Sequence, residues 1–160
     1  MRGFAGQYTY WKEGCPIIVP NTVVKDGAEA FLQLLFQAQA SLPSSFWMGL
    51  TNVDYTYDDA VLADIAAGEP TGNGYARQEL VRDTDDWDVS EVNGLMRARS
   101  KIVTFTASAN WDKEWNRMFL CSVETGTAGI IFSFSAKTED DQAVVSGDGP
   151  SLRYEYWNRI

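Results

Sequence analysis

Period-two alternation runs through the stretch Leu152-Arg153-Tyr154-Glu155-Tyr156-Trp157, close to the end of the chain. Leu152, Tyr154 and Tyr156 share one face of an extended backbone, and the residues between them share the other. The stretch Lys101-Ile102-Val103-Thr104-Phe105-Thr106 alternates in the same way. Two such stretches, about fifty residues apart and bounded by turn-forming residues, favour a fold built from short antiparallel strands.

Further segments extend this β pattern in both directions. Strands are predicted over residues 46–51, 75–81, 117–123, 129–135 and 143–145, with a long loop over 52–73. Two Asn-Gly pairs, Asn73-Gly74 and Asn93-Gly94, mark turns. Seven or eight short strands and one short N-terminal α-helix predict a mainly β fold, either an antiparallel β-sandwich or a jelly roll.

The one strong helical pattern covers residues 26–40. Asp26 and Glu29 have the spacing of a capping box, which satisfies the free amides of a first turn. Apolar residues then recur at three- and four-residue spacing, and Pro43 ends the helix; they are Phe31, Leu34, Leu35 and Ala38. We therefore expect Leu35 to be buried between this helix and the sheet.

Residues 1–20 are predicted to form an extended N-terminal arm, followed by a single β-sandwich domain over residues 21–160. Five glycines and prolines interrupt any periodicity in the arm. Tyr8, Tyr10 and Trp11 are nevertheless too apolar for a solvated tail. Such an arm packs either on its own domain or on a neighbouring subunit, and docking on a neighbour is the favoured alternative.

The composition excludes several classes of partner. Thirteen basic and 22 acidic residues give a net charge of −9, which repels phosphate backbones and anionic bilayers. No apolar stretch is long enough to cross a membrane, and the N-terminus lacks the apolar core of a signal peptide. We therefore expect synthesis in a reducing cytoplasm, with Cys15 and Cys121 as free thiols. Neither nucleic acid nor membrane is an expected partner.

Catalytic and metal-binding residues are not evident in the sequence. The chain has no histidine, which removes His-based triads, His-based metal centres and the usual acid–base group near neutral pH. Asp83, Asp85, Asp86 and Asp88 lack the spacing of a calcium loop, so we expect no tightly held ion there and interpret them as a solvated loop. No cofactor is predicted. A small carbohydrate-active enzyme stays open as a hypothesis, because two carboxylates can suffice for glycoside hydrolysis.

Two motifs carry a resemblance to a known family. They are Gly49-Leu50-Thr51-Asn52 and Glu69-Pro70-Thr71-Gly72-Asn73-Gly74-Tyr75-Ala76-Arg77-Gln78. A helix precedes the first motif, and a strand with aromatic residues ends the chain. This order of helix, motifs and strand resembles that of virion structural proteins of tailed bacteriophages. Members of that family are capsid decoration, head-fibre or tail components. The resemblance covers about residues 20–160 and assigns no functional residues.

The resemblance implies a non-enzymatic virion protein, first of all a capsid decoration (cement) protein that binds the outer shell and stabilises it. Its partners would be the major capsid protein or other virion proteins, together with further copies of itself in a dimer or trimer. The alternative is a tail, fibre or baseplate adhesin that recognises the host surface. Exposed aromatic residues would make the contacts; the candidates are Tyr8, Tyr10, Trp11, Tyr55, Tyr57, Trp111 and Trp115.

Overall fold

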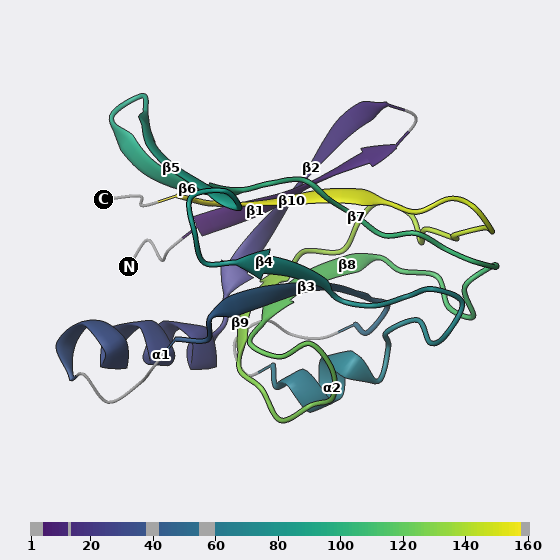
Figure 1. Cartoon of the computed structure of the whole chain (residues 1–160), viewed down its shortest axis with the longest axis horizontal. Helices are drawn as coiled ribbons and strands as arrows, with labels where there is room; N and C mark the ends of the chain where they lie inside the picture. The colour runs from purple at the N-terminus through teal and green to yellow at the C-terminus, as the bar shows by residue number, and fades with distance from the viewer. Residues whose placement is uncertain (1–4, 13, 38–41, 55–59, 158–160) are drawn as a thin grey trace.

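Ten strands and two helices make up the part of the chain that the computed structural model describes, residues 5–12, 14–37, 42–54 and 60–157 (Figure 1). The strands are β1 (Ala5–Lys12), β2 (Cys15–Val23), β3 (Ser45–Thr51), β4 (Gln78–Val81), β5 (Trp87–Val92), β6 (Leu95–Ser100), β7 (Val103–Thr104), β8 (Arg117–Cys121), β9 (Ile131–Ser135) and β10 (Ser151–Trp157). The helices are α1 (Lys25–Phe36) and α2 (Leu62–Ala66). Neither described helix is long and apolar enough to cross a membrane.

All ten strands belong to one antiparallel sheet. Its order is β4-β3-β8-β9-β2-β1-β10-β6-β5, and β7 pairs with β10 beside this path. β2 and β9 pair only between residues 21–23 and 133–135, where the sheet turns from one layer into the other (Figure 1). The prediction of a mainly β, antiparallel, sandwich-like fold is confirmed, and the two layers nearly close into a barrel.

The core has two parts, and β8 lies between them. Met118 and Leu120 face the larger cluster between the layers, whereas Phe119 and Cys121 face a second cluster that α2 covers. Every residue of β8 is buried, which explains why its last four residues, Met118 to Cys121, are all apolar instead of alternating. Gly49 on β3 gives the Phe119 ring its space, because a side chain there would overlap the ring.

The extended N-terminal arm is the main correction to the sequence analysis. Residues 5–12 form β1, which pairs with β2 on one side and with β10 on the other, in the middle of the sheet. Tyr8 is 0 % exposed and Tyr10 is also buried, both within the main core. The domain therefore includes β1 and does not begin at residue 21. The arm was inferred from its glycines and prolines, but the alternation of Tyr8, Thr9 and Tyr10 is itself a strand pattern.

The predicted helix exists over a shorter range and packs differently. α1 begins after Val24 and not at an Asp26 capping box, and Gln37 ends it. Gly27 and Ala30 are its buried residues, and a Cβ at Gly27 would lie 2.6 Å from the Phe132 Cα of β9. The helix is thus held to the sheet by small residues in its first turns, and the rest projects away from the layers (Figure 1). Ala38 lies outside the described residues.

The burial predicted for Leu35 is wrong, since its side chain is 57 % exposed. We therefore expect Leu35→Ala to change the free energy of unfolding of the monomer by no more than about 0.5 kcal/mol, as exposed sites do. Urea denaturation of the purified variant measures this value. A loss of about 2 kcal/mol or more, typical of a buried leucine, would contradict the exposed position.

Several strand boundaries also differ from the prediction. β4 begins at Gln78, and β7 has only two residues because the backbone on either side bonds to loop residues. Residues 143–145 form no strand, and the predicted loop over 52–73 contains α2. The Asn93-Gly94 turn is confirmed: with φ of 53° and 80°, these residues connect β5 and β6. Neither β5 nor β6 was predicted as a strand.

Candidate functional site

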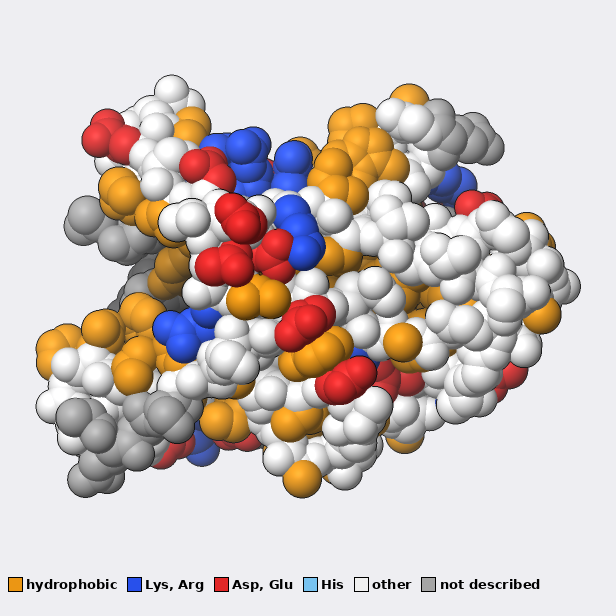
Figure 2. Space-filling view, in the orientation of Figure 1, with side chains coloured by type: hydrophobic (Ala, Val, Ile, Leu, Met, Phe, Trp, Pro, Cys, Tyr) orange, Lys and Arg blue, Asp and Glu red, His pale blue; other side chains and the backbone are white. Residues whose placement is uncertain are grey.

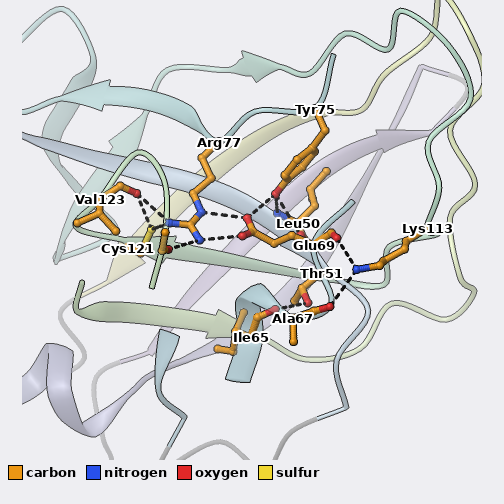
Figure 3. A network of polar contacts seen from close by, with 11 residues as sticks. Leu50, Thr51, Ile65, Ala67, Glu69, Tyr75, Arg77, Lys113, Cys121 and Val123 are labelled. Carbon is orange, nitrogen blue, oxygen red and sulfur yellow. Dashed lines mark hydrogen bonds and ion pairs between the residues drawn. The ribbon is translucent and has the colours of Figure 1, made fainter. Parts of the chain in front are cut away.

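A buried ion pair lies at the centre of the longer sequence motif (Figure 3). Arg77 Nη2 is 2.7 Å from Glu69 Oε2, and Arg77 Nε donates to Glu69 Oε1 at 2.9 Å. The remaining guanidinium donors reach the carbonyl oxygens of Val123 and Gly126, each at 3.0 Å. The guanidinium also stacks over the Phe119 ring at 5.3 Å. Arg77 thereby ties the motif to β8 and to the loop after it.

Tyr75 joins this pair to β3. Its hydroxyl donates to Glu69 Oε1 at 2.8 Å and accepts the Leu50 backbone N–H at 2.9 Å. Burial raises the pKa of Tyr75 well above its ordinary value, and the negative charge of Glu69 raises it further. The phenol therefore stays protonated and serves as a fixed hydrogen-bond donor. Its ring stacks on Phe105 and meets Trp111 edge-on.

The remaining motif residues hold the loop over 106–112. The backbone N–H and the hydroxyl of Thr71 donate to the two oxygens of Asp112, at 2.6 and 2.7 Å. These hydrogen bonds lower the pKa of the Asp112 carboxyl. Gly74 has a φ of +83°, and a Cβ there would lie 2.6 Å from the Thr106 carbonyl oxygen. Glycine is required at this position for both reasons.

The network is closed within the protein. Lys113 Nζ donates to the carbonyl oxygens of Ala67 and Glu69, and Thr51 Oγ1 donates to that of Ile65, which fixes α2 against β3 (Figure 3). Cys121 is buried beside Arg77, and burial raises the pKa of its thiol. The charged groups at the centre face one another and the backbone, so the motif links α2, β3 and the loop after β8.

Four of the predicted partner-binding residues are buried in the core. Tyr8, Tyr10, Trp111 and Trp115 all belong to the cluster between the layers. The Tyr10 and Trp115 rings meet edge-on at 5.4 Å. The prediction that they contact a partner is wrong, because the fold itself covers them.

The other three predicted residues differ from these. Trp11 is half-buried near the end of β1, with its ring 5.4 Å from the Arg153 Cζ. Tyr55 and Tyr57 lie outside the described residues.

The acidic loop after β4 binds its own backbone and a neighbouring lysine. Asp83 Oδ1 accepts the backbone N–H groups of Asp85 and Asp86. The Asp86 carboxylate accepts the Val81 N–H and pairs with Lys101. Among the described residues, no group of three or more His, Cys, Asp or Glu side chains is arranged to hold a metal ion.

An apolar cleft opens between α1 and the β5–β6 hairpin, at the left of Figure 2. Its volume is about 610 Å³. Aromatic and aliphatic side chains from α1, β3, β8, β9 and β10 line it; they include Phe31, Phe46, Leu120, Phe132, Tyr154 and Tyr156. Its walls come from elements far apart in the sequence, so no local pattern could have predicted it.

A second apolar surface lies at the end of the β1–β2 hairpin, at the upper right in Figure 2. We call it the β1–β2 tip: residues 11, 12 and 14–18. Pro16 is exposed and Ile18 is 61 % exposed, beside the half-buried Trp11 and Ile17. Here β2 pairs with β1 and with no other described strand, so the hairpin projects beyond β10 (Figure 1). The apolar run at residues 16–19 was the signal for this surface in the sequence.

Comparisons of this chain with protein-family models, with curated proteins and with solved structures find no match.

Proposed function

We propose that this chain is a non-enzymatic structural subunit of a bacteriophage particle, and specifically a capsid decoration protein that attaches through its β1–β2 tip. The observation that carries the proposal is the projecting hairpin, with Ile18 and Pro16 exposed next to Trp11. An apolar group on a projecting element costs free energy in water unless another surface covers it. The two motifs resemble those of virion proteins, and we therefore propose that the surface covering the tip is the outer shell of the capsid.

The chemistry of the tip favours side-chain docking over strand addition. Pro16 and Pro20 lie on the outer strand of the hairpin and lack the N–H that a further strand would need. A partner would therefore cover the Trp11 and Ile18 side chains. Aromatic and aliphatic anchors of this kind contribute most of the affinity in many interfaces.

The rest of the molecule suits a rigid subunit. The Glu69–Arg77 network, with Tyr75, holds the motif loop against β3 and against the loop after β8. The net charge of −9 keeps the free protein soluble before assembly. Rigid placement of the hairpin lowers the entropy lost on docking.

The test uses particles of a phage from whose genome the gene for this chain has been deleted. Purified wild-type protein is expected to bind them in many copies, counted by quantitative mass spectrometry, and deletion is expected to leave host adsorption unchanged. Ile18→Ser should weaken binding at least about tenfold, with a melting temperature within about 2 °C of wild type.

Val61→Ser is the matched control, because Val61 is also exposed but lies at the start of α2, which is far from the β1–β2 hairpin (Figure 1). It should bind particles like wild type. A few copies per particle, with binding of the isolated protein to host cells, would refute decoration and favour the adhesin. Full binding by Ile18→Ser would refute the role of the tip.

A further inference from the structure

We propose that the apolar cleft and the free end of α1 together form the contact between two copies of this chain, with the helix of each copy seated in the cleft of the other. This inference rests on the proposed function and identifies one partner of the subunit, a second copy. It uses a surface separate from the β1–β2 tip.

The helix supplies a projecting ridge. Leu32, Leu35 and Phe36 are exposed on the last turns of α1, and Phe36 is 80 % exposed. The buried anchors Gly27 and Ala30 lie in its first turns, so the apolar end is held away from the sheet. Such a short helix is not stable alone, and covering its apolar side would stabilise it.

The cleft supplies the matching hollow beside the ridge. Ala28 and Phe31 line the cleft, and Leu32, Leu35 and Phe36 continue the same side of the helix beyond it. Across the opening, the β5–β6 hairpin presents Val89, which is 66 % exposed. A projection and a hollow on one surface are what a two-fold symmetric contact needs, because each copy then offers both halves.

Charge favours a second copy over a strongly charged partner. The sequence has no charged residue between Glu29 and Asp54. The only charged residues lining the cleft among the described residues are Arg82 and Asp83, which have opposite signs. The surface is therefore close to neutral on a chain of net charge −9. Two acidic molecules repel each other least when they meet through surfaces that carry no net charge. The charges elsewhere on each copy are screened beyond about 8–10 Å at physiological salt.

The area is sufficient for a stable dimer. The exposed side chains of the ridge and the cleft walls that receive them would bury on the order of 600 Å² per copy, from typical side-chain areas. That value is at the lower end of the range for specific interfaces. Because the contact is apolar and the net charges repel, higher salt should strengthen it, opposite to a contact made by ion pairs.

Sedimentation velocity of the purified full chain tests the inference. Wild-type protein is expected to be a dimer at micromolar concentration, and its dissociation constant should fall as sodium chloride is raised. Phe36→Ser and Val89→Asp, which alter ridge and cleft separately, should each weaken the dimer at least about tenfold. Val145→Ser is the matched exposed control and should dimerise like wild type. A monomer at all concentrations and salts, or full dimerisation of Phe36→Ser, would overturn the inference.

Disulfide trapping tests the reciprocal arrangement. Phe36→Cys and Val89→Cys are made separately in a Cys15→Ser background, which removes the exposed native thiol. Mixing the two proteins under mild oxidation should give a disulfide between unlike copies. Disulfides only between two copies of the Phe36→Cys protein would overturn the seating of helix in cleft.

Failure of this inference can be separated from failure of the proposed function. A wild-type chain that is monomeric in solution but binds particles through Ile18 would overturn the dimer and leave decoration standing. A dimer that dissociates in Phe36→Ser and binds no particles would support the dimer and refute decoration.

Discussion

Arg77→Ala is expected to lower the free energy of unfolding by about 3–5 kcal/mol, the cost of removing one partner of a buried ion pair. The Arg77 side chain is 3 % exposed, and it provides two of the hydrogen bonds to the Glu69 carboxylate. Without it, that carboxylate is buried without its counter-charge, and the carbonyl oxygens of Val123 and Gly126 lose a donor. The loop over 69–77 would then detach from β8. Urea denaturation followed by tryptophan fluorescence measures the change.

Lys137→Ala is the matched control for this prediction. Lys137 and Asp141 form an ion pair in which both side chains are about half exposed, and such pairs contribute about 1 kcal/mol or less. The double variant Glu69→Leu/Arg77→Met should recover part of the loss, because apolar groups of similar size need no counter-charge. A loss below about 1 kcal/mol for Arg77→Ala would show that the network does not hold the motif loop.

Removal of residues 1–12 is expected to leave a chain without a cooperative unfolding transition. β1 pairs with β2 over residues 5–12 and with β10 over residues 5–10, so its loss breaks the sheet in the middle. It also empties the space that Tyr8 and Tyr10 fill in the main core. Near-ultraviolet circular dichroism and thermal unfolding would detect the loss of packing. An arm that docked only on a neighbour would instead leave a folded, stable domain.

Tyr8→Ala isolates the packing part of this effect. A fully buried aromatic ring replaced by alanine costs about 3–5 kcal/mol, and Tyr8 is 0 % exposed. Tyr8→Phe keeps the ring and removes only the hydrogen bonds of the hydroxyl to Ser133, to Oγ at 3.1 Å and to the carbonyl oxygen at 3.4 Å, which should cost about 0.5–1.5 kcal/mol. A truncated chain with a native circular dichroism spectrum, or a Tyr8→Ala variant as stable as wild type, would contradict the placement of β1.

The two exposed apolar surfaces lie at different ends of the molecule. The β1–β2 tip is at the upper right in Figure 2, and α1 is at the lower left. A subunit that binds a shell through the tip would therefore keep α1 and the cleft open for a second copy. Binding of one copy to the shell would then raise the local concentration of its dimer partner's tip near the shell. Shell binding and dimerisation would therefore strengthen each other without any new contact within the chain.

The motif over residues 69–78 could be recognised in the sequence, but its structural role could not be predicted from it. Glu69, Tyr75 and Arg77 stand close together in the chain, and their spacing alone indicates neither burial nor pairing. Their partners are Leu50, Val123 and Gly126, which are 19 or more residues away from each of them. A buried arginine and a solvated arginine look alike in a sequence, because the difference lies in what the fold brings around them.

By itself, the sequence determined the elements whose signals are local. The alternation in residues 152–157 predicted β10, the Asn93-Gly94 pair predicted a turn, and the spacing of apolar residues predicted α1. Only the tertiary structure decided where these elements lie. β1 became a central strand by pairing with β10, some 145 residues later. α1 keeps Leu35 exposed because its buried residues, Gly27 and Ala30, lie in its first turns. Periodicity records which face of an element is apolar, whereas the surface that covers this face depends on contacts between distant residues.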